Sequence, residues 1–341
     1  MRKLTRGSGI LAFLLIGAVA FGLSDRVLGS DTQDKEKFSG HKAGKASIVD
    51  AREGHATLWK EPGAIENLDL FYGPGGTEGA PDASATFTFV RRSTSGTSKK
   101  IIVKDDKGRQ WTVKFGAEAR PETAATRILW AMGYHVDEDY FVKRAHIEGW
   151  KEGDALNVRF ERNHKGSKEI GLWNWDDNPF KGTRELDGLK VLMVLMNNWD
   201  LKTDNNKVLQ YDKDSGGDRD ERVYYVSDLG ASFGSTGSLV RKILIFSDPP
   251  AGSKGKPSDY SHQTFIDGVD NGKVRFHYKG KDQDALKGIT VENAKWMGSM
   301  LVRLSEKQLA DAFRAAGFDA SEVATYVRAM KDRIGELQNL R

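Results

Sequence analysis

One apolar run constrains this chain more than any other feature of its sequence. Residues 186–196 read LDGLKVLMVLM, and apolar side chains lie almost all the way round the helix that this run would form. A helix without a polar face has to be surrounded by protein, so the run predicts a fully buried helix. The next residues are NNWDLKTDNN, in which acids, a lysine and amides follow directly on the buried run. This order predicts a functional loop that a rigid helix holds in place.

The segments on either side of the run differ in character. Before it, β-branched and aromatic residues predict strands over residues 86–90, 99–105, 110–116, 141–145 and 155–161. One helix interrupts them over RPETAATRILWAMGY, with Pro121 in its first turn and Gly133 as its C-terminal cap. After the run we expect a short strand over 223–226 and helices over 291–304, 305–316 and 323–334. Ser305 and Gln308 have the spacing of a capping box. The pattern predicts an α+β fold.

The N-terminus predicts an export signal. A basic start, MRKLTR, precedes an apolar stretch over residues 10–23, and Val27 and Gly29 have the spacing of a cleavage site. Residues 1–29 are therefore expected to be a signal peptide, with an uncleaved membrane anchor as the alternative, and residues 30–60 a flexible tail. The sequence contains no cysteine and no Asn-x-Ser/Thr sequon, which favours a bacterial envelope protein, periplasmic or extracellular. The leader supplies much of the net charge of +4, so no nucleic-acid partner is expected.

Two glycine-containing links could approach phosphate groups. The link STSGTS, residues 93–98, joins two expected strands. Gly96 would let the backbone approach closely, and the hydroxyls of Ser95 and Thr97 could donate hydrogen bonds to phosphate oxygens. The link GPGGTEGAPD, residues 73–82, is followed by no helical pattern and is expected to be a plain loop. Residues 95–97 are therefore the predicted phosphate contacts.

A lysine stands among apolar residues at the end of an expected strand. Lys114 closes the segment WTVK, where a cation could hold the phosphates of a nucleotide. An acid near the start of the next helix would orient this lysine. Glu122 is the first candidate and Glu118 the second, and the sequence alone does not decide between them.

The loop after the buried run has a regular spacing. In DLKTDN, Asp200, Lys202 and Asn205 stand at relative positions 0, +2 and +5. An acid so placed could accept a proton from a hydroxyl, while the amide reaches a metal ion on the phosphates. Asp200 and Lys202 are the predicted catalytic residues, and Asn205 is a predicted metal ligand.

A second acidic motif follows an expected strand. In YYVSDLG, Asp228 comes directly after the β run and before Leu229 and Gly230. A carboxylate at the end of a strand could bind Mg²⁺ or Mn²⁺ between nucleotide phosphates. Asp228 is therefore the second predicted metal ligand, with ATP as the nucleotide.

These motifs, in this order, resemble the atypical branch of the protein-kinase-like superfamily. The chain is similar to HipA-type kinases and type II phosphatidylinositol 4-kinases over about residues 85–235. The resemblance implies a bilobal fold, with a strand-rich N-lobe over 61–162 that contains one helix, and a helical C-lobe over 163–341. It also implies that Lys114 binds the phosphates, Glu122 orients it, Asp200 is the base, and Asn205 and Asp228 hold the metal.

The chain also departs from the usual kinase pattern. Asn198 and Trp199 precede Asp200 in place of His-Arg, and Leu229 replaces the Phe of D-F-G. No A-P-E segment follows. The acceptor hydroxyl, on a protein, a lipid or a small molecule, is left open by the sequence.

Two other functions are compatible with the sequence. The segment Gly-Ala-Ser-Phe-Gly, residues 230–234, matches the G-x-S-x-G elbow of serine hydrolases, with Ser232 as nucleophile and His262 or His277 downstream. A non-catalytic nucleotide-binding module is the other alternative, because bacterial envelopes hold little ATP. The aromatic loop LWNWDDNPF, with Trp173 and Trp175, could stack on a sugar or fill the lower lobe.

Overall fold

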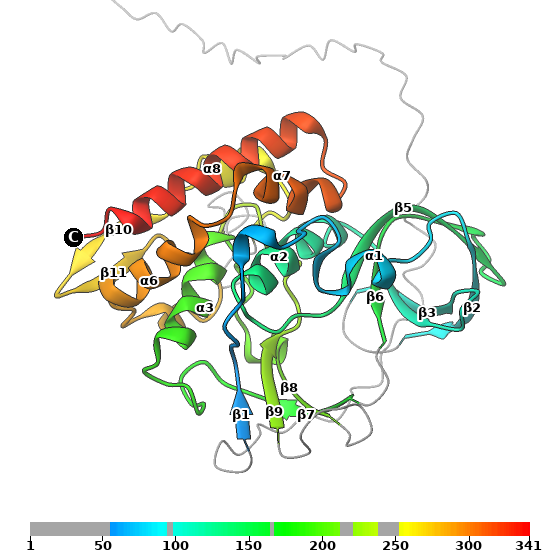
Figure 1. Ribbon diagram of the computed structural model, residues 1–341, viewed down its shortest axis with the longest axis horizontal. Coiled ribbons are helices and arrows are strands. Elements are labelled where there is room, and N and C mark those ends of the chain that lie inside the picture. The colour runs from blue at the N-terminus through cyan, green and yellow to red at the C-terminus, as the bar shows by residue number, and fades with distance from the viewer. Residues whose placement is uncertain (1–54, 94–97, 164–166, 212–220, 238–251) are drawn as a thin grey trace, which may run out of the picture. The chain divides into compact units, whose positions relative to one another are not determined.

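The computed structural model describes residues 55–93, 98–163, 167–211, 221–237 and 252–341. They form a mixed α+β structure with a strand-rich part and a helical part (Figure 1), as the sequence predicts. The predicted signal peptide lies outside the described residues. Among the described residues, no helix is both long and apolar enough to cross a membrane.

The strand-rich part is a closed barrel. Its strands are β2 (Thr86–Arg92), β3 (Lys100–Lys104), β4 (Gln110–Lys114), β5 (Asp139–Glu148) and β6 (Asp154–Arg162), in the order β2-β3-β4-β6-β5. The pairs are antiparallel except for β2 and β5, which run parallel. Phe87, Trp111 and Phe160 are fully buried inside it. Closure leaves β2 and β5 without a free edge.

Helix α2 (Ala119–Ala131) follows β4 and lies between the barrel and the helical part (Figure 1). It contacts β5, β6 and α7 (Glu306–Ala315). Its stripe of Ala124, Ala125, Ile128 and Leu129 is fully buried, as the sequence predicts. Because it touches both parts, α2 connects the barrel to the large core.

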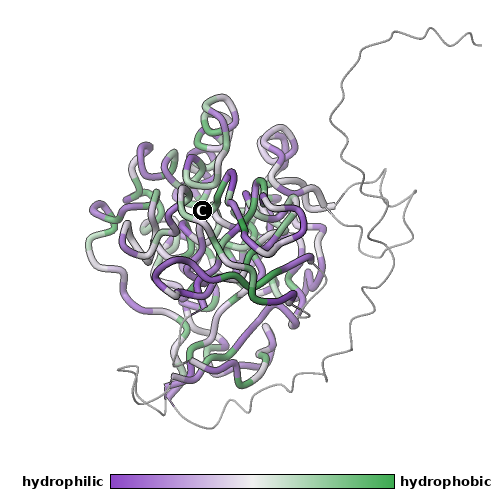
Figure 2. Tube along the Cα trace, turned by 90° about the vertical axis from the view of Figure 1, so that its right-hand side faces the viewer, coloured by the Kyte–Doolittle hydropathy of each residue, from purple (hydrophilic) through white to green (hydrophobic). Residues whose placement is uncertain are grey.

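Helix α3 (Arg184–Leu195) is the predicted buried helix. Every residue from Val191 to Leu195 is fully buried, and the Thr183 side chain caps the N-terminus by accepting from the Leu186 N–H at 3.2 Å. Helix α6 (Val291–Leu301) packs against it, and α8 (Ala320–Gln338) contacts its last residue, Leu195. Helix α7 packs on α2 and α8. The predicted capping box of α7 is present. In Figure 2 the apolar stretches, in green, alternate with hydrophilic ones along the trace.

A second sheet was only partly predicted. Its order is β1 (His55–Thr57), β9 (Glu221–Val226), β8 (Asn206–Tyr211) and β7 (Ser167–Leu172). Only β9 was expected, because β7 and β8 contain many polar residues and their strand form depends on mutual pairing. The prediction of a flexible tail over residues 30–60 is wrong for its last residues, since β1 pairs with β9 and Leu58 is buried.

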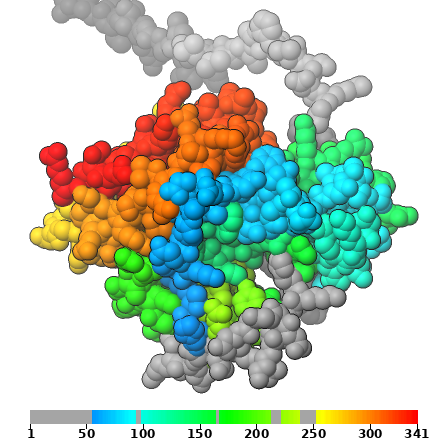
Figure 3. Space-filling model, in the orientation of Figure 1, coloured from blue at the N-terminus to red at the C-terminus, as the bar shows by residue number. Residues whose placement is uncertain are grey.

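The segment after β1 lies on the helical part. Figure 3 shows it in blue between the C-terminal helices and the barrel. The Gln308 side-chain amide donates to the carbonyls of Ile65 at 2.8 Å and Leu68 at 3.0 Å. The loop expected over residues 73–82 instead contains a 3₁₀ turn (Gly73–Gly75) and the short helix α1 (Gly76–Gly79). The remaining elements are α5 (Pro257–Ser261) and the hairpin β10 (Ile266–Asp270) and β11 (Lys273–Phe276).

A buried arginine of α8 ties the C-terminus of α3 to its surroundings. Arg333, only 3% exposed, donates to the Leu195 carbonyl at 2.7 Å and to the Asn197 side-chain oxygen at 2.9 Å. It also donates to the carbonyls of Tyr260 at 3.1 Å and Gln263 at 3.2 Å. The positive charge lies at the negative end of the α3 dipole, which favours it.

We therefore expect Arg333→Met to lower the free energy of unfolding by about 3 kcal/mol or more, because it leaves several buried acceptors without a donor. Urea denaturation followed by circular dichroism measures this loss. Arg328→Met, an exposed arginine on the same helix, is the control and should change stability by less than about 0.5 kcal/mol. Equal effects of the two substitutions would contradict this role of Arg333.

Candidate active site

The last residue of β4 is a buried cation surrounded by carboxylates. The Lys114 side chain is 2% exposed. Its Nζ lies 2.8 Å from Glu118 Oε2, 3.0 Å from Glu122 Oε2 and 3.3 Å from Asp228 Oδ1. Lys114 and Asp228 are 114 positions apart in the chain, so only the fold brings them together.

The local sequence explains why two glutamates reach this lysine. Glu118 and Glu122 are four residues apart at the start of α2, which places both side chains on one face of the helix. The positive end of the helix dipole also favours acids in this turn. The sequence left the choice between them open, and the structure shows both in contact with Lys114.

The two glutamates differ in their surroundings. Burial raises the pKa of Glu122, although Arg159 and Lys114 act against this rise. For Glu118 burial alone would also raise the pKa, but the ammonium groups of Lys114 and Lys254 outweigh it and lower the pKa to about 2. Lys254 contacts Glu118 directly. Glu118 is therefore a firmly ionised partner of two lysines.

A buried network of charges contacts the other carboxylate oxygen of Glu122, Oε1. Arg159 lies 3.1 Å from Glu122 Oε1 and 3.2 Å from Asp139 Oδ2, and Arg127 lies 3.2 Å from Asp139 Oδ1. All four side chains are at most 2% exposed. Sequence reasoning missed this network. The available signal was a pair of arginines beside apolar residues, Arg127 before Ile128 in α2 and Arg159 between Val158 and Phe160 in β6.

The polar loop after α3 is closed by its own side chains. Asn197, at φ 52°, turns the chain out of the helix. The Asp200 N–H donates to Asn198 Oδ1 at 3.0 Å, and Asn205 Nδ2 donates to the Asp200 carbonyl at 2.7 Å. The Ser227 N–H donates to the Asn205 carbonyl at 2.8 Å, which joins this loop to the residue before Asp228.

Two lysines flank the Asp200 carboxylate. Lys281 Nζ lies 2.8 Å from Oδ1, and Lys202 Nζ lies 3.1 Å from Oδ2. Burial alone would raise the pKa of Asp200, but the Lys281 hydrogen bond and the Lys202 charge lower it below its usual value. Lys281 was not predicted, because it follows β11 far along the chain and has no motif around it.

Asp228 belongs to a group of acids that could hold a metal ion. Carboxylate oxygens of Asp228, Glu118 and Glu122 lie within 4.8 Å of one another. Asp228 is the most accessible, at 39% side-chain exposure. The glycine two residues later is required by packing, since a Cβ on Gly230 would lie 2.6 Å from the Glu118 Cβ.

The predicted residues therefore form two linked groups. Lys114, Glu122 and Asp228 are in contact, and Asp200 and Asn205 are joined through their loop. The Asn205 carbonyl accepts from Ser227, the residue before Asp228 in the chain. Their chemical roles stay predictions. Ser95, Gly96 and Thr97 lie outside the described residues.

The end of the predicted phosphate link does reach the acidic group. The hydroxyl of Ser98, the last residue of that link, donates to Glu118 Oε2 at 3.2 Å. The link therefore ends beside the carboxylates that surround Lys114.

The hydrolase alternative is contradicted by the surroundings of Ser232. Its side chain is fully buried, and among the described residues its hydroxyl has no hydrogen-bond partner. His262 Nδ1 lies 2.6 Å from the Ser258 carbonyl, and His277 Nδ1 lies 2.9 Å from Asp267 Oδ1. A nucleophile needs a base within hydrogen-bond reach and access for substrate.

The aromatic loop fills the helical part rather than forming an open platform. Trp173 and Trp175 are 1% and 2% exposed. Trp173 Nε1 donates to the Tyr225 carbonyl at 3.0 Å, and Trp175 Nε1 donates to the Leu201 carbonyl at 2.7 Å. Both tryptophans therefore support the backbone beside Asp228 and Asp200.

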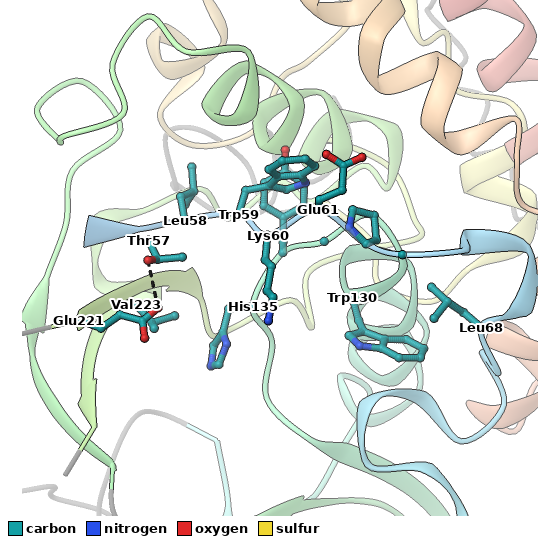
Figure 4. Close-up of a pocket in the computed structure, with 14 residues that line it drawn as sticks. Thr57, Leu58, Trp59, Lys60, Glu61, Leu68, Trp130, His135, Glu221 and Val223 are labelled. Atoms are coloured by element: carbon teal, nitrogen blue, oxygen red, sulfur yellow. Dashed lines mark hydrogen bonds between the residues drawn. The ribbon is translucent and has the colours of Figure 1, made fainter. Parts of the chain in front are cut away.

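A separate cavity lies at the other end of α2. It has a volume of about 360 Å³ and is lined by the β1 segment, the C-terminal end of α2 and β9. Figure 4 shows Trp59, Trp130, His135 and Lys60 around it. None of its lining residues belongs to the Lys114 or Asp200 groups.

Comparison with known proteins adds little to this geometry. No protein-family model matches the chain, and no curated protein matches it. Among solved structures, the chain is similar to the Helicobacter pylori proinflammatory kinase CtkA, with 11% identity and a TM-score of 0.42. The match covers 72% of this chain and 91% of that one.

Glu118 should make the free energy of unfolding depend on pH in the acid range. Its folded pKa of about 2 lies below the ordinary value of 4.5, so its contribution is complete above about pH 4.5 and is lost as the pH falls towards about 2. We expect Glu118→Gln to lower the urea midpoint at about pH 6 and to have a smaller effect at about pH 3. Asp284→Asn, which removes an exposed acid, is the control. An effect of Glu118→Gln that does not change with pH would contradict the assignment.

Proposed function

We propose that this chain is an ATP-dependent phosphotransferase with a bilobal, kinase-like fold, in which the barrel and α2 form one lobe and the helices around α3 the other. The observation that carries the proposal is the contact of Lys114 with both Glu122 and Asp228. A strand lysine, an acid of the following helix and an acid after a distant strand are the parts that position nucleotide phosphates in kinases.

Each residue would have a separate role in the transfer. Lys114 would hold the nucleotide phosphates, with Glu122 fixing its position. The acceptor hydroxyl oxygen forms a bond to the γ-phosphorus while the bond between that phosphorus and the β–γ bridging oxygen breaks, and ADP leaves. The hydroxyl proton passes to Asp200, which the Asn198 and Asn205 side chains hold in place.

The site also suits a divalent cation. Mg²⁺ and Mn²⁺ prefer oxygen ligands, and Asp228 offers an accessible carboxylate. The Asn205 nitrogen is engaged with the Asp200 carbonyl, which leaves its amide oxygen as the ligand atom. When bound, the cation would neutralise phosphate charge.

A non-catalytic nucleotide-binding module is the second candidate. It is favoured by the two lysines that occupy both carboxylate oxygens of Asp200, because an acid held in this way is a weak base. Nucleotide binding without turnover would identify this second function.

The sharpest test compares two acids of the same loop. We expect Asp200→Asn to lower the rate of γ-phosphoryl transfer, measured as ATP hydrolysis and autophosphorylation, by about 10²- to 10⁴-fold. Binding should persist, seen as a rise in melting temperature with ATP and Mg²⁺ or Mn²⁺. Asp204→Asn, an exposed neighbour, should retain the wild-type rate.

Lys114→Met should abolish the melting shift, because it removes the cation that holds the phosphates. A wild-type protein that shows no shift with any nucleotide and either cation would refute nucleotide binding, and with it both candidate functions.

A further inference from the structure

The two lysines at Asp200 restrict how an acceptor hydroxyl can reach this carboxylate. A general base must present a free carboxylate oxygen to the hydroxyl. Here Lys281 lies at Oδ1 and Lys202 at Oδ2, and the Asp200 side chain is only 13% exposed. Because Oδ1 is buried and Lys281 Nζ lies against it, Lys281 has to move before a hydroxyl can reach this oxygen.

Of these two lysines, Lys281 is the one that an incoming acceptor would contact. Lys202 is part of the loop itself, two residues after Asp200, and the sequence already predicts it to be catalytic. Lys281 comes from the segment after β11, and its N–H donates to the Trp199 carbonyl at 2.8 Å. Its side chain is 37% exposed, so it can reach an incoming molecule.

A second ammonium group lies near the ring of Trp199 as well. Lys281 Nζ lies 5.6 Å and Lys254 Nζ 5.2 Å from the centre of the Trp199 ring, the residue directly before Asp200. Lys254 contacts Glu118, which also has Lys114 as a partner. Glu118 would therefore keep a cation if Lys254 moved.

Moving Lys281 away from Asp200 carries a cost. Asp200 keeps Lys202 as a partner, whereas the ammonium group of Lys281 loses the carboxylate that it contacts. The cost is offset if an anion takes the place of Asp200 as the partner of Lys281. Two ammonium groups can together neutralise a doubly charged group that spans them.

We propose, on the basis of the phosphotransferase function above, that the acceptor carries a phosphate-like dianion near its hydroxyl, and that this dianion draws Lys281 off Asp200. Lys281 and Lys254 bind the dianion, and Oδ1 of Asp200 becomes free for the hydroxyl proton. The reaction is then coupled to the correct acceptor, because Asp200 stays covered in its absence.

The test replaces the acceptor with two small molecules, one for its hydroxyl group and one for its anionic group. Water serves as the hydroxyl, so that its oxygen attacks the γ-phosphorus, its proton passes to Asp200, and inorganic phosphate and ADP form. Phosphite dianion serves as the anionic piece. We expect phosphite to increase the rate of MgATP hydrolysis by the wild-type protein about tenfold in a saturable manner, by freeing the base.

The matched variants are Lys281→Met and Lys287→Met. Lys281→Met should hydrolyse MgATP about tenfold faster than wild type without phosphite, and should lose most of the phosphite response. Lys287 is 77% exposed and pairs with Asp284, so Lys287→Met should behave as wild type. Formate, a single-charged control, should stimulate weakly.

Several outcomes would overturn the proposal. A wild-type protein that hydrolyses MgATP without any response to phosphite would refute it, as would Lys281→Met with a lower basal rate and an unchanged phosphite response. Formate as effective as phosphite would refute the dianion. The melting shift with MgATP is measured on the same samples. Its absence, or the absence of hydrolysis in every variant with and without phosphite, would instead refute the phosphotransferase function on which this inference rests.

Discussion

The burial of one ammonium group organises this molecule. Lys114 has almost no contact with solvent, and a charge in that position requires partners close by. Those partners come from the first turn of α2 and from the residues after β9, so the barrel, the helix and the second sheet must all be in place together. Removing one partner from a buried pair typically costs about 3–5 kcal/mol. The geometry of the proposed nucleotide site is thus enforced by the stability of the fold.

The loop that carries Asp200 is positioned by packing on all sides. Helix α3 gives it a rigid start, Arg333 holds the end of that helix, and Trp175 binds the Leu201 carbonyl. Each support is buried, so the loop backbone has few alternatives. Such support allows short polar side chains to be held at hydrogen-bonding distance without a bound ligand.

Sequence patterns predicted the elements with strong periodicity. The five barrel strands, α2, α3 and the terminal helices were expected, because their apolar residues recur with the spacing of a strand or a helix. Strands β1, β7 and β8 were missed, since they lack a clear alternation of apolar residues and form by pairing with distant segments. For the site, Lys114, Asp200 and Asp228 stood out by their local motifs. Lys281 and Lys254 did not, because an isolated lysine has no pattern around it. Arg159 was overlooked, although it stands between two apolar residues of a predicted strand.

The amino-acid sequence by itself determined that residues 186–196 form a buried helix and that a polar loop follows it. It also determined that an acid four residues before Glu122 shares its helix face, because these properties depend on residues close together in the chain. Only the tertiary structure decided that Lys114 meets Asp228, that both glutamates bind Lys114, and that Lys281 covers Asp200. Contacts between distant segments depend on strand register and helix packing, which arise from the summed burial of the whole core rather than from any local run of residues.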